Sequence, residues 1–388
     1  MKITKVKIHN FRSIIDEEFE AHAYLMFVGA NNAGKSNIIN ALRIFYEDLN
    51  WSDNDFPKTG AKDNDSWIEI TYILNDSEWE MLADKYKIDS TDKKIKLRRY
   101  FTGNKFKKSQ SNIFAVINGE EDESYFYGAK NISTAKCGTI IYIPAVTTAT
   151  EQFKTIGSSP FNKILDFVFG KVVSSNPLYQ KLVDVFEELN KDGQKDNGFL
   201  SVITSPLNNA LKEWKIKMEL SIDNLKPEDI SKKLINSSFY DDVFGEIKLG
   251  IDSFGHGYQR SVIYELIKLA SRFKEEKINT KKEFNPEFTL ILFEEPEAFL
   301  HPTQQENMAF HLRKLANEYN QQVIITTHSP IFVGKSSDEL SQIARVKKSN
   351  GITKLYQLND LNKQTLFESG HDFYKVIQEY INDPLIEE

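Results

Sequence analysis

The chain has 388 residues, of which 40% are hydrophobic, so it is long enough for one large core or two smaller ones. Its formal net charge of −7 excludes a protein that coats nucleic acid through overall basicity, and any DNA contact must therefore be local. Cys137 is the only cysteine, which excludes an intramolecular disulfide or a thiolate metal cage and suits the reducing cytoplasm.

The N-terminal sequence does not have the pattern of a signal peptide or of a membrane helix. Its opening, MKITKVKIHNFRS, lacks the apolar core of a signal peptide, and no apolar run approaches the roughly 20 residues that a membrane helix needs. We therefore expect a cytoplasmic protein with no membrane partner.

Strand-like stretches at residues 2–11 and 24–28 lead into a glycine-bearing turn and a helical pattern. Between residues 67 and 143, short apolar-polar alternations predict a largely antiparallel β lobe.

The middle of the chain changes to helical periodicity, from residue 145 to 234, with one strand-like run at residues 215–222. From residue 246 strands and helices alternate, which is typical of an α/β lobe, and residues 371–388 read as one amphipathic helix. The pattern predicts a discontinuous domain, residues 1–144 and 246–388, around a mostly helical insertion, residues 145–245, that is a candidate dimerisation region.

A phosphate-binding loop is the most specific motif. Residues 29–36 read GANNAGKS, which fits G-x-x-x-x-G-K-[ST] directly after a strand and directly before a helix. Gly29 and Gly34 would let backbone N–H groups turn toward phosphate oxygens, Lys35 would neutralise them, and Ser36 would hold Mg²⁺. An ordinary glycine turn is the alternative.

A second element carries adjacent acids. The hydrophobic run FTLILFEE ends in Glu294 and Glu295, whose like charges repel where water is scarce unless a cation lies near. Such a strand predicts that Glu294 binds Mg²⁺, directly or through water, and that Glu295 polarises the attacking water. At the first of these two acidic positions, that of Glu294, aspartate is commoner than glutamate. The alternative is a helix N-terminus with acids in its first turn, and Glu297 is assigned to the turn that follows.

Two further elements indicate the class of ATPase. Residues 252–270 place Ser253, Gly255 and Gly257 at the start of a helix, where an open backbone receives an anion. The strand VIITT ends at His328, about 30 residues after Glu295, where a histidine could touch the γ-phosphate. Alone, a histidine at a strand end is more often simply hydrogen-bonded in place.

These elements follow the order of the ABC-type ATPases, and KIHNFRSI, GANNAGKSNIINAL, GHGYQR, LFEEPEAFLHPTQQ and ITTHSPIFV resemble the ATPase region of the OLD (overcoming lysogenization defect) family, a relative of RecF and SMC heads. The resemblance implies an α/β fold of the ABC head type, a RecA-like lobe plus an antiparallel β lobe. It also implies a homodimer with ATP between the subunits, in which Ser253 and its glycines reach the partner's γ-phosphate. By the same resemblance, Arg12, Asn31, Asn32, Ala33 and Asn37 lie near the nucleotide, and Asp55 is the candidate for the missing Q-loop residue and a metal contact.

One departure from that family concerns the nuclease. OLD proteins resemble an ATPase followed by a TOPRIM nuclease with a glutamate and a later Asp-x-Asp on strand ends. This chain stops at Glu388, where that domain would begin, and its Asp-x-Asp triplets, residues 53–55 and 63–65, lie in a polar stretch that we interpret as a solvated loop. The nuclease is expected to be absent, supplied by another chain, or removed.

Residues 93–110 combine eight Lys or Arg with three aromatic residues around a turn. They could grip the phosphates of double-stranded DNA, but alternation alone favours an exposed hairpin with its lysines outward.

The leading hypothesis is an ATP-hydrolysing dimeric switch that controls a nucleic-acid-processing effector, in phage defence or DNA processing. The alternatives are a RecF-like or SMC-like DNA clamp and a slowly hydrolysing, ATP-gated scaffold for a partner protein. The helical insertion carries no sustained heptads, which disfavours long coiled-coil arms. A signature other than L-S-G-G-Q disfavours an importer subunit.

Overall fold

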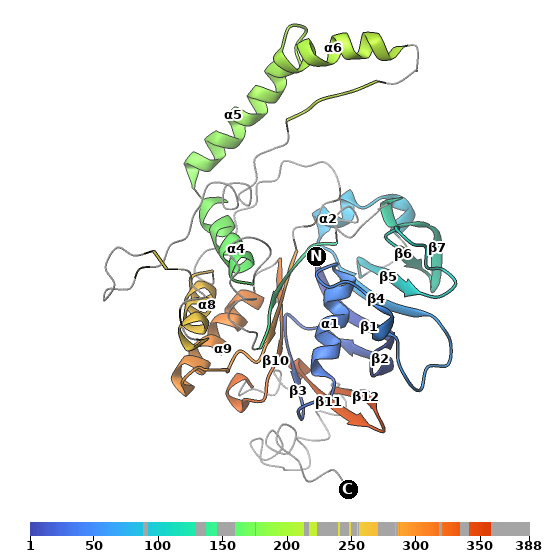
Figure 1. The fold of residues 1–388 in the computed structure, drawn as a ribbon, viewed down its shortest axis with the longest axis vertical. Helices are drawn as coiled ribbons and strands as arrows, with labels where there is room; N and C mark the ends of the chain where they lie inside the picture. Colours follow the sequence, from blue (N-terminus) through green and yellow to red (C-terminus); the bar gives the residue numbers. More distant parts are fainter. Residues whose placement is uncertain are drawn as a thin grey trace. The chain divides into compact units, whose positions relative to one another are not determined.

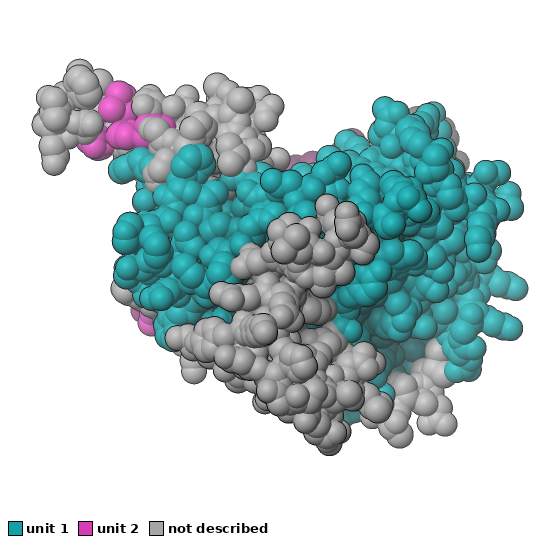
Figure 2. Space-filling view, turned by 90° about the horizontal axis from the view of Figure 1, so that it is seen from below, with its two compact units in different colours: residues 1–152, 255–271, 279–388 teal, residues 153–254, 272–278 magenta. Residues whose placement is uncertain are grey.

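The computed structural model describes residues 1–87, 92–128, 137–145, 160–174, 176–212, 217–222, 240, 248–249, 254, 256–270, 284, 286, 288–317, 320–333 and 341–357. The chain divides into two compact units (Figure 2). Unit 1 comprises residues 1–152, 255–271 and 279–388, and unit 2 comprises residues 153–254 and 272–278. The first unit ends at residue 152 rather than 144 and resumes at residue 255 rather than 246, and unit 2 includes a second segment, residues 272–278, that was not expected from the sequence.

Unit 1 contains two six-stranded sheets within the described residues. The first is antiparallel, with strand order β2-β1-β4-β5-β6-β7. Alternate residues of β1 and β4 are buried, as expected for a sheet with one covered face. Its strands are β1 (Lys2–Phe11), β2 (Ile14–Glu20), β4 (Ser66–Ile73), β5 (Lys94–Thr102), β6 (Ile113–Ile117) and β7 (Glu120–Tyr125).

The second sheet has the order β12-β11-β3-β10-β9-β8 and is parallel from β11 to β8. Every residue of β3 is buried, and the sequence YLMFV is the continuous apolar run that a central parallel strand requires. Its strands are β3 (Tyr24–Val28), β8 (Thr139–Ile143), β9 (Thr289–Glu294), β10 (Gln321–Thr326), β11 (Ile343–Ser349) and β12 (Ile352–Gln357).

Helix α1 (Lys35–Phe45) lies between the two sheets (Figure 1). Its buried residues join residues of β1, β4, β3 and β9 in one hydrophobic cluster, so both faces of the helix are covered. Helix α9 (Pro302–Ala316) packs on the opposite side of the second sheet against β10 and β3, with α8 (His256–Ala270) beside it. The described part of unit 1 also contains five short helical segments, α2 (Asp76–Met81), η1 (Asp53–Asp55), η2 (Asp84–Tyr86), η3 (Phe126–Gly128) and η6 (Pro330–Phe332).

Unit 2 contains three described helices, α4 (Pro160–Ser174), α5 (Pro177–Gly193) and α6 (Phe199–Leu211). The strand expected at residues 215–222 is wrong for its described part, residues 217–222, which form no strand. Met218 instead exchanges two hydrogen bonds with the Asn208 side chain, at 2.7 and 2.8 Å, so a side chain satisfies the backbone that a neighbouring strand would have paired. The helix expected at residues 371–388 lies outside the described residues.

Candidate nucleotide site

The predicted phosphate-binding loop connects β3 to α1. Gly34 is the N-cap residue of α1 with φ of 111°, and no side chain caps this end of the helix. An uncapped helix N-terminus presents backbone N–H groups to an anion, as the motif requires. Asn31, Asn32 and Ser36 are exposed. The loop borders a pocket of about 350 Å³ lined by Gly29, Ala30, Asn31, Asn32, Ala33, Arg345, Val346, Lys347, Lys348 and Gly351.

Lys35 is buried at the start of α1 and makes three polar contacts. Its Nζ donates to the carbonyls of Gly29 (2.8 Å) and Ala30 (3.0 Å) and to Nε2 of His328 (2.9 Å). An ammonium has only donors, so Nε2 of His328 accepts and the proton of a neutral ring sits on Nδ1. Lys35 and His328, which are 293 positions apart in the chain, are therefore in direct contact through Nε2 of the histidine.

The electrostatics agree with this assignment. Burial lowers the pKa of the Lys35 ammonium, while the charges of Glu295, Glu297 and Glu294 act to raise it. Burial and then the charge of Lys35 lower the pKa of His328, so the imidazole is neutral at physiological pH and keeps its acceptor.

The two adjacent glutamates have different environments. Glu294, the last residue of β9, is 8% exposed, and its Oε2 accepts a hydrogen bond from the Tyr142 hydroxyl at 2.9 Å. Its Oε1 is buried and has no hydrogen-bond partner among the described residues. Glu295 turns out of the strand with φ of 45°, its side chain is 37% exposed, and its Oε1 lies 3.9 Å from Nε2 of His328. One carboxylate is thus buried with a free oxygen, and the other faces solvent beside the histidine.

Glu297 makes contacts that no sequence motif predicted. It lies in the turn after β9, as expected, but its carboxylate accepts from Oγ1 of Thr327 (2.8 Å) and from the backbone N–H of His328 (2.7 Å). The turn after β9 is thereby tied to the loop after β10, and His328 is held by its backbone.

Arg12 and Asn37 are joined at the base of the loop. Arg12 donates through Nε to Oδ1 of Asp55 at 2.8 Å and through a terminal nitrogen to Oδ1 of Asn37 at 3.4 Å. Oδ2 of Asp55 accepts from the backbone and hydroxyl of Ser52. Both oxygens of Asp55 are therefore engaged by protein donors, which disfavours the metal contact expected of this residue.

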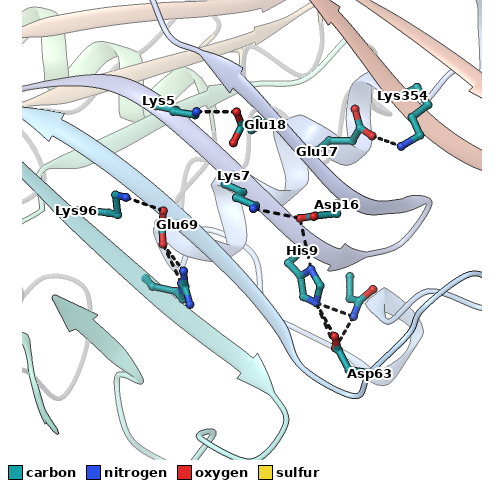
Figure 3. Close-up of polar contacts among 12 residues, drawn as sticks. Lys5, Lys7, His9, Asp16, Glu17, Glu18, Asp63, Glu69, Lys96 and Lys354 are labelled. Carbon is teal, nitrogen blue, oxygen red and sulfur yellow. Dashed lines mark hydrogen bonds and ion pairs between the residues drawn. The ribbon is translucent and has the colours of Figure 1, made fainter. Parts of the chain in front are cut away.

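The interpretation of the two Asp-x-Asp triplets as a solvated loop is wrong for Asp55, which is buried. Asp63 in the second triplet accepts from His9 (3.2 Å) and Asn10 (2.9 Å) (Figure 3). Each triplet is therefore anchored by side chains of β1 or of the turn after it. Of the predicted signature residues, Gly257 lies in the first turn of α8, and Ser253 and Gly255 lie outside the described residues.

The basic hairpin of residues 93–110 has several of its charges paired within the β lobe. Arg98 donates to Glu69 and Glu121, and Lys105 pairs with Glu121. Arg99 donates to the carbonyl of Phe45 at 2.5 Å, where it caps the C-terminus of α1. Lys96 of the same hairpin pairs with Glu69, and on the neighbouring strands β1 and β2 Lys5 pairs with Glu18 and Lys7 with Asp16 (Figure 3). These intramolecular salt bridges neutralise part of the basic charge, which disfavours the use of this hairpin as a DNA-binding surface.

Comparison with known proteins assigns the chain to a family. A family model described as "AAA ATPase domain" matches residues 1–142 and 171–333, a span that includes the loop, both glutamates and His328. The chain belongs to the AAA ATPase domain family. No helix in the described part of this AAA ATPase domain is both long and apolar enough to cross a membrane.

Two relatives and one solved structure of similar fold bear on the architecture of this AAA ATPase domain. It is 24% identical to the "Old nuclease" of Escherichia phage P2 over 98% of its own length, and it spans 67% of that protein. It is 24% identical to an "ATP/GTP phosphatase" of Helicobacter pylori, covering 92% of each chain. The Smc head domain with an extended coiled coil from Pyrococcus furiosus superposes with a TM-score of 0.53 at 14% identity, covering 95% of this chain and 99% of that one. The resemblance to the OLD family and the predicted ABC-type head fold are confirmed.

Proposed function

We propose that this AAA ATPase domain binds ATP with Mg²⁺ and hydrolyses the γ-phosphate bond. The observation that carries the proposal is the meeting of Lys35, Glu295 and His328, with Nζ of Lys35 2.9 Å and Oε1 of Glu295 3.9 Å from the same nitrogen of His328. Strands β3, β9 and β10 are adjacent and parallel, so their carboxyl ends bring the three motifs to one edge of the sheet.

The residues present fit a magnesium ion. Glu294 offers a buried carboxylate oxygen without a hydrogen-bond partner among the described residues, and Ser36 offers an exposed hydroxyl in the loop motif. Bound Mg²⁺ would neutralise charge on the phosphate oxygens. Lys35 would then exchange its carbonyl partners for phosphate oxygens, and Glu295 would orient and deprotonate the attacking water. The neutral His328 ring, whose Nε2 is an acceptor, would donate to the γ-phosphate through its N–H at Nδ1.

The direct test is phosphate release from ATP by the purified chain, measured with Mg²⁺ and again with excess chelator. We expect release that requires both ATP and the divalent ion. Binding of ATP without measurable release would favour the alternative of an ATP-gated scaffold, and absence of binding would contradict the proposed site.

We further propose that the functional form is a dimer joined through unit 2. On α5, Leu178, Leu182, Val185 and Leu189 recur at spacings of four, three and four, and each is at least 45% exposed. This is the seam of a short coiled coil, and no described part of unit 2 covers it. Helix α6 adds further exposed apolar residues, namely Phe199, Val202, Ile203 and Leu207.

A second copy of α5, antiparallel about a two-fold axis, complements this seam. Leu182 would then face Val185 of the second copy, and Leu178 would face Leu189. Lys181 and Glu188, both exposed, flank the seam on the same side, so each lysine would lie beside the glutamate of the other copy. The seam is therefore complementary to itself in shape and in charge.

Leu182→Asp is expected to convert this dimer to a monomer. Each copy would lose about 1.5–3 kcal/mol of apolar burial, which for two copies weakens the dimer roughly 100- to 10,000-fold. Gln180→Asp introduces the same carboxylate two residues away, on the polar side of α5, and should leave the dimer intact. Sedimentation equilibrium of both variants without nucleotide makes the comparison. A Leu182→Asp dimer as tight as wild type would refute the seam.

The similarity to a protein called Old nuclease supports a nucleic-acid-processing effector, in phage defence or DNA processing, whose action the nucleotide state of this domain controls. Because this chain spans about two thirds of that relative, we propose that the dimer presents or gates a nuclease domain. The ATP/GTP phosphatase, which this chain covers almost completely, supports the other candidate, nucleotide hydrolysis as the whole activity. Phosphate release that rises on adding a partner or DNA would favour the first candidate.

A further inference from the structure

Tyr142 lies beside the proposed metal ligand on the neighbouring strand. Strands β8 and β9 are parallel, with Tyr142 in register with Leu292, two residues before Glu294. The Tyr142 hydroxyl reaches along the sheet and donates to Oε2 of Glu294 at 2.9 Å. A carboxylate oxygen has no proton to give, so the phenol O–H is the donor in this contact.

The ring of Tyr142 is itself held in place. The guanidinium carbon of Arg43 lies 3.6 Å from the ring centre, which is a close cation–π contact. Arg43 is fixed by Oδ2 of Asp48 at 2.8 Å and by Oδ1 of Asn40 at 3.0 Å. Arg43 and Asn40 belong to α1, the helix that begins at Lys35. The orientation of Glu294 is therefore set by the same helix that carries the phosphate-binding lysine.

This contact gives the two carboxylate oxygens of Glu294 different hydrogen-bonding environments. Oε2 is engaged by Tyr142, while Oε1 is buried without a hydrogen-bond partner among the described residues. A buried carboxylate oxygen without a partner is costly, so its persistence indicates a place for a cation or its water. Glutamate also has one more rotatable bond than the aspartate that is commoner at this position, and a single fixed donor offsets that added freedom.

Resting on the proposed function, we propose that Tyr142 is a positioning residue that fixes the carboxylate of Glu294 through Oε2 and leaves Oε1 free for the divalent ion. It contributes orientation rather than chemistry. Loss of its hydroxyl alone should therefore lower the affinity for the divalent ion and leave the phosphate contacts of Lys35 unchanged.

The test is Tyr142→Phe, which keeps the ring and its contact with Arg43. With a non-hydrolysable ATP analogue, Mn²⁺ binding measured by electron paramagnetic resonance is expected to weaken roughly 10- to 100-fold, the usual effect of removing a partner that orients a metal ligand. Binding of the analogue without a divalent ion should match wild type. Hydrolysis should recover toward the wild-type rate as Mg²⁺ is raised.

Two further variants separate this role from general destabilisation. Tyr46→Phe removes a hydroxyl from a buried Tyr46–Tyr72 hydrogen bond of 2.9 Å and should leave Mn²⁺ affinity unchanged. In a Glu294→Gln background, Tyr142→Phe should cause no additional loss, because it acts through Glu294. Mn²⁺ affinity within two-fold of wild type in Tyr142→Phe, or full additivity with Glu294→Gln, would overturn the role of Tyr142 while the proposed function stands. A wild-type chain that binds no Mn²⁺ with the analogue would overturn both.

Discussion

Glu295→Gln is expected to slow ATP hydrolysis by roughly 100- to 1,000-fold, within the range that a general base contributes, while ATP binding stays intact. Glutamine keeps the size of the side chain and removes only its ability to take a proton. The side chain is 37% exposed and contacts His328 only at 3.9 Å, so the substitution should not disturb the fold. Glu294, which holds the proposed ion, is unchanged.

The matched control for this variant is Glu306→Gln, which makes the same chemical change at an exposed position of α9. It should hydrolyse ATP at the wild-type rate. Single-turnover hydrolysis and binding of a fluorescent ATP analogue, measured on the same preparations, separate chemistry from affinity. If Glu295→Gln hydrolyses within about three-fold of wild type, another group activates the water and the ATP-gated scaffold gains support.

The elements that meet at the candidate nucleotide site could be picked out from the sequence because each has a local signature. The P-loop motif combines a continuous apolar strand, two glycines and a helix start, and these neighbours in the chain remain neighbours in the fold. The meeting of Glu295 with His328 was also predictable, since parallel strands bring their carboxyl ends to the same edge. The helical character of the insertion followed from periodicity alone.

Contacts between single residues on different elements could not be read in this way. Tyr142 is one aromatic residue in TIIYI, and only the register of β8 against β9 brings its hydroxyl to Glu294. Asp55 resembled a metal ligand in sequence, but Arg12, distant in the chain, engages its carboxylate. The row of exposed apolar residues on α5 has no such signature, because a helix of 17 residues holds only about two heptads.

Gly34→Ala is expected to destabilise the folded chain and abolish nucleotide binding together. Gly34 has φ of 111°, where a Cβ is strained, and an added Cβ would lie well inside van der Waals contact with Oγ1 of Thr353 and 2.9 Å from its Cγ2. Thr353 is fully buried, and its hydroxyl donates to the carbonyl of Ala33 at 3.0 Å, so it cannot move without releasing the loop. Strain and overpacking together should lower the free energy of unfolding by about 2–5 kcal/mol.

Gly119→Ala separates the two causes of that loss. Gly119 also has a positive φ, of 88°, but an added Cβ there would meet nothing within 4 Å. It should therefore lose only the backbone part, about 1–2 kcal/mol by urea unfolding, and retain ATP binding. Adding Thr353→Ala to Gly34→Ala removes the nearest clashing atoms and should restore part of the stability but not the loop, because the hydrogen bond to Ala33 is lost with the hydroxyl. Equal destabilisation by Gly34→Ala and Gly119→Ala would show that β12 does not hold the phosphate-binding loop in place.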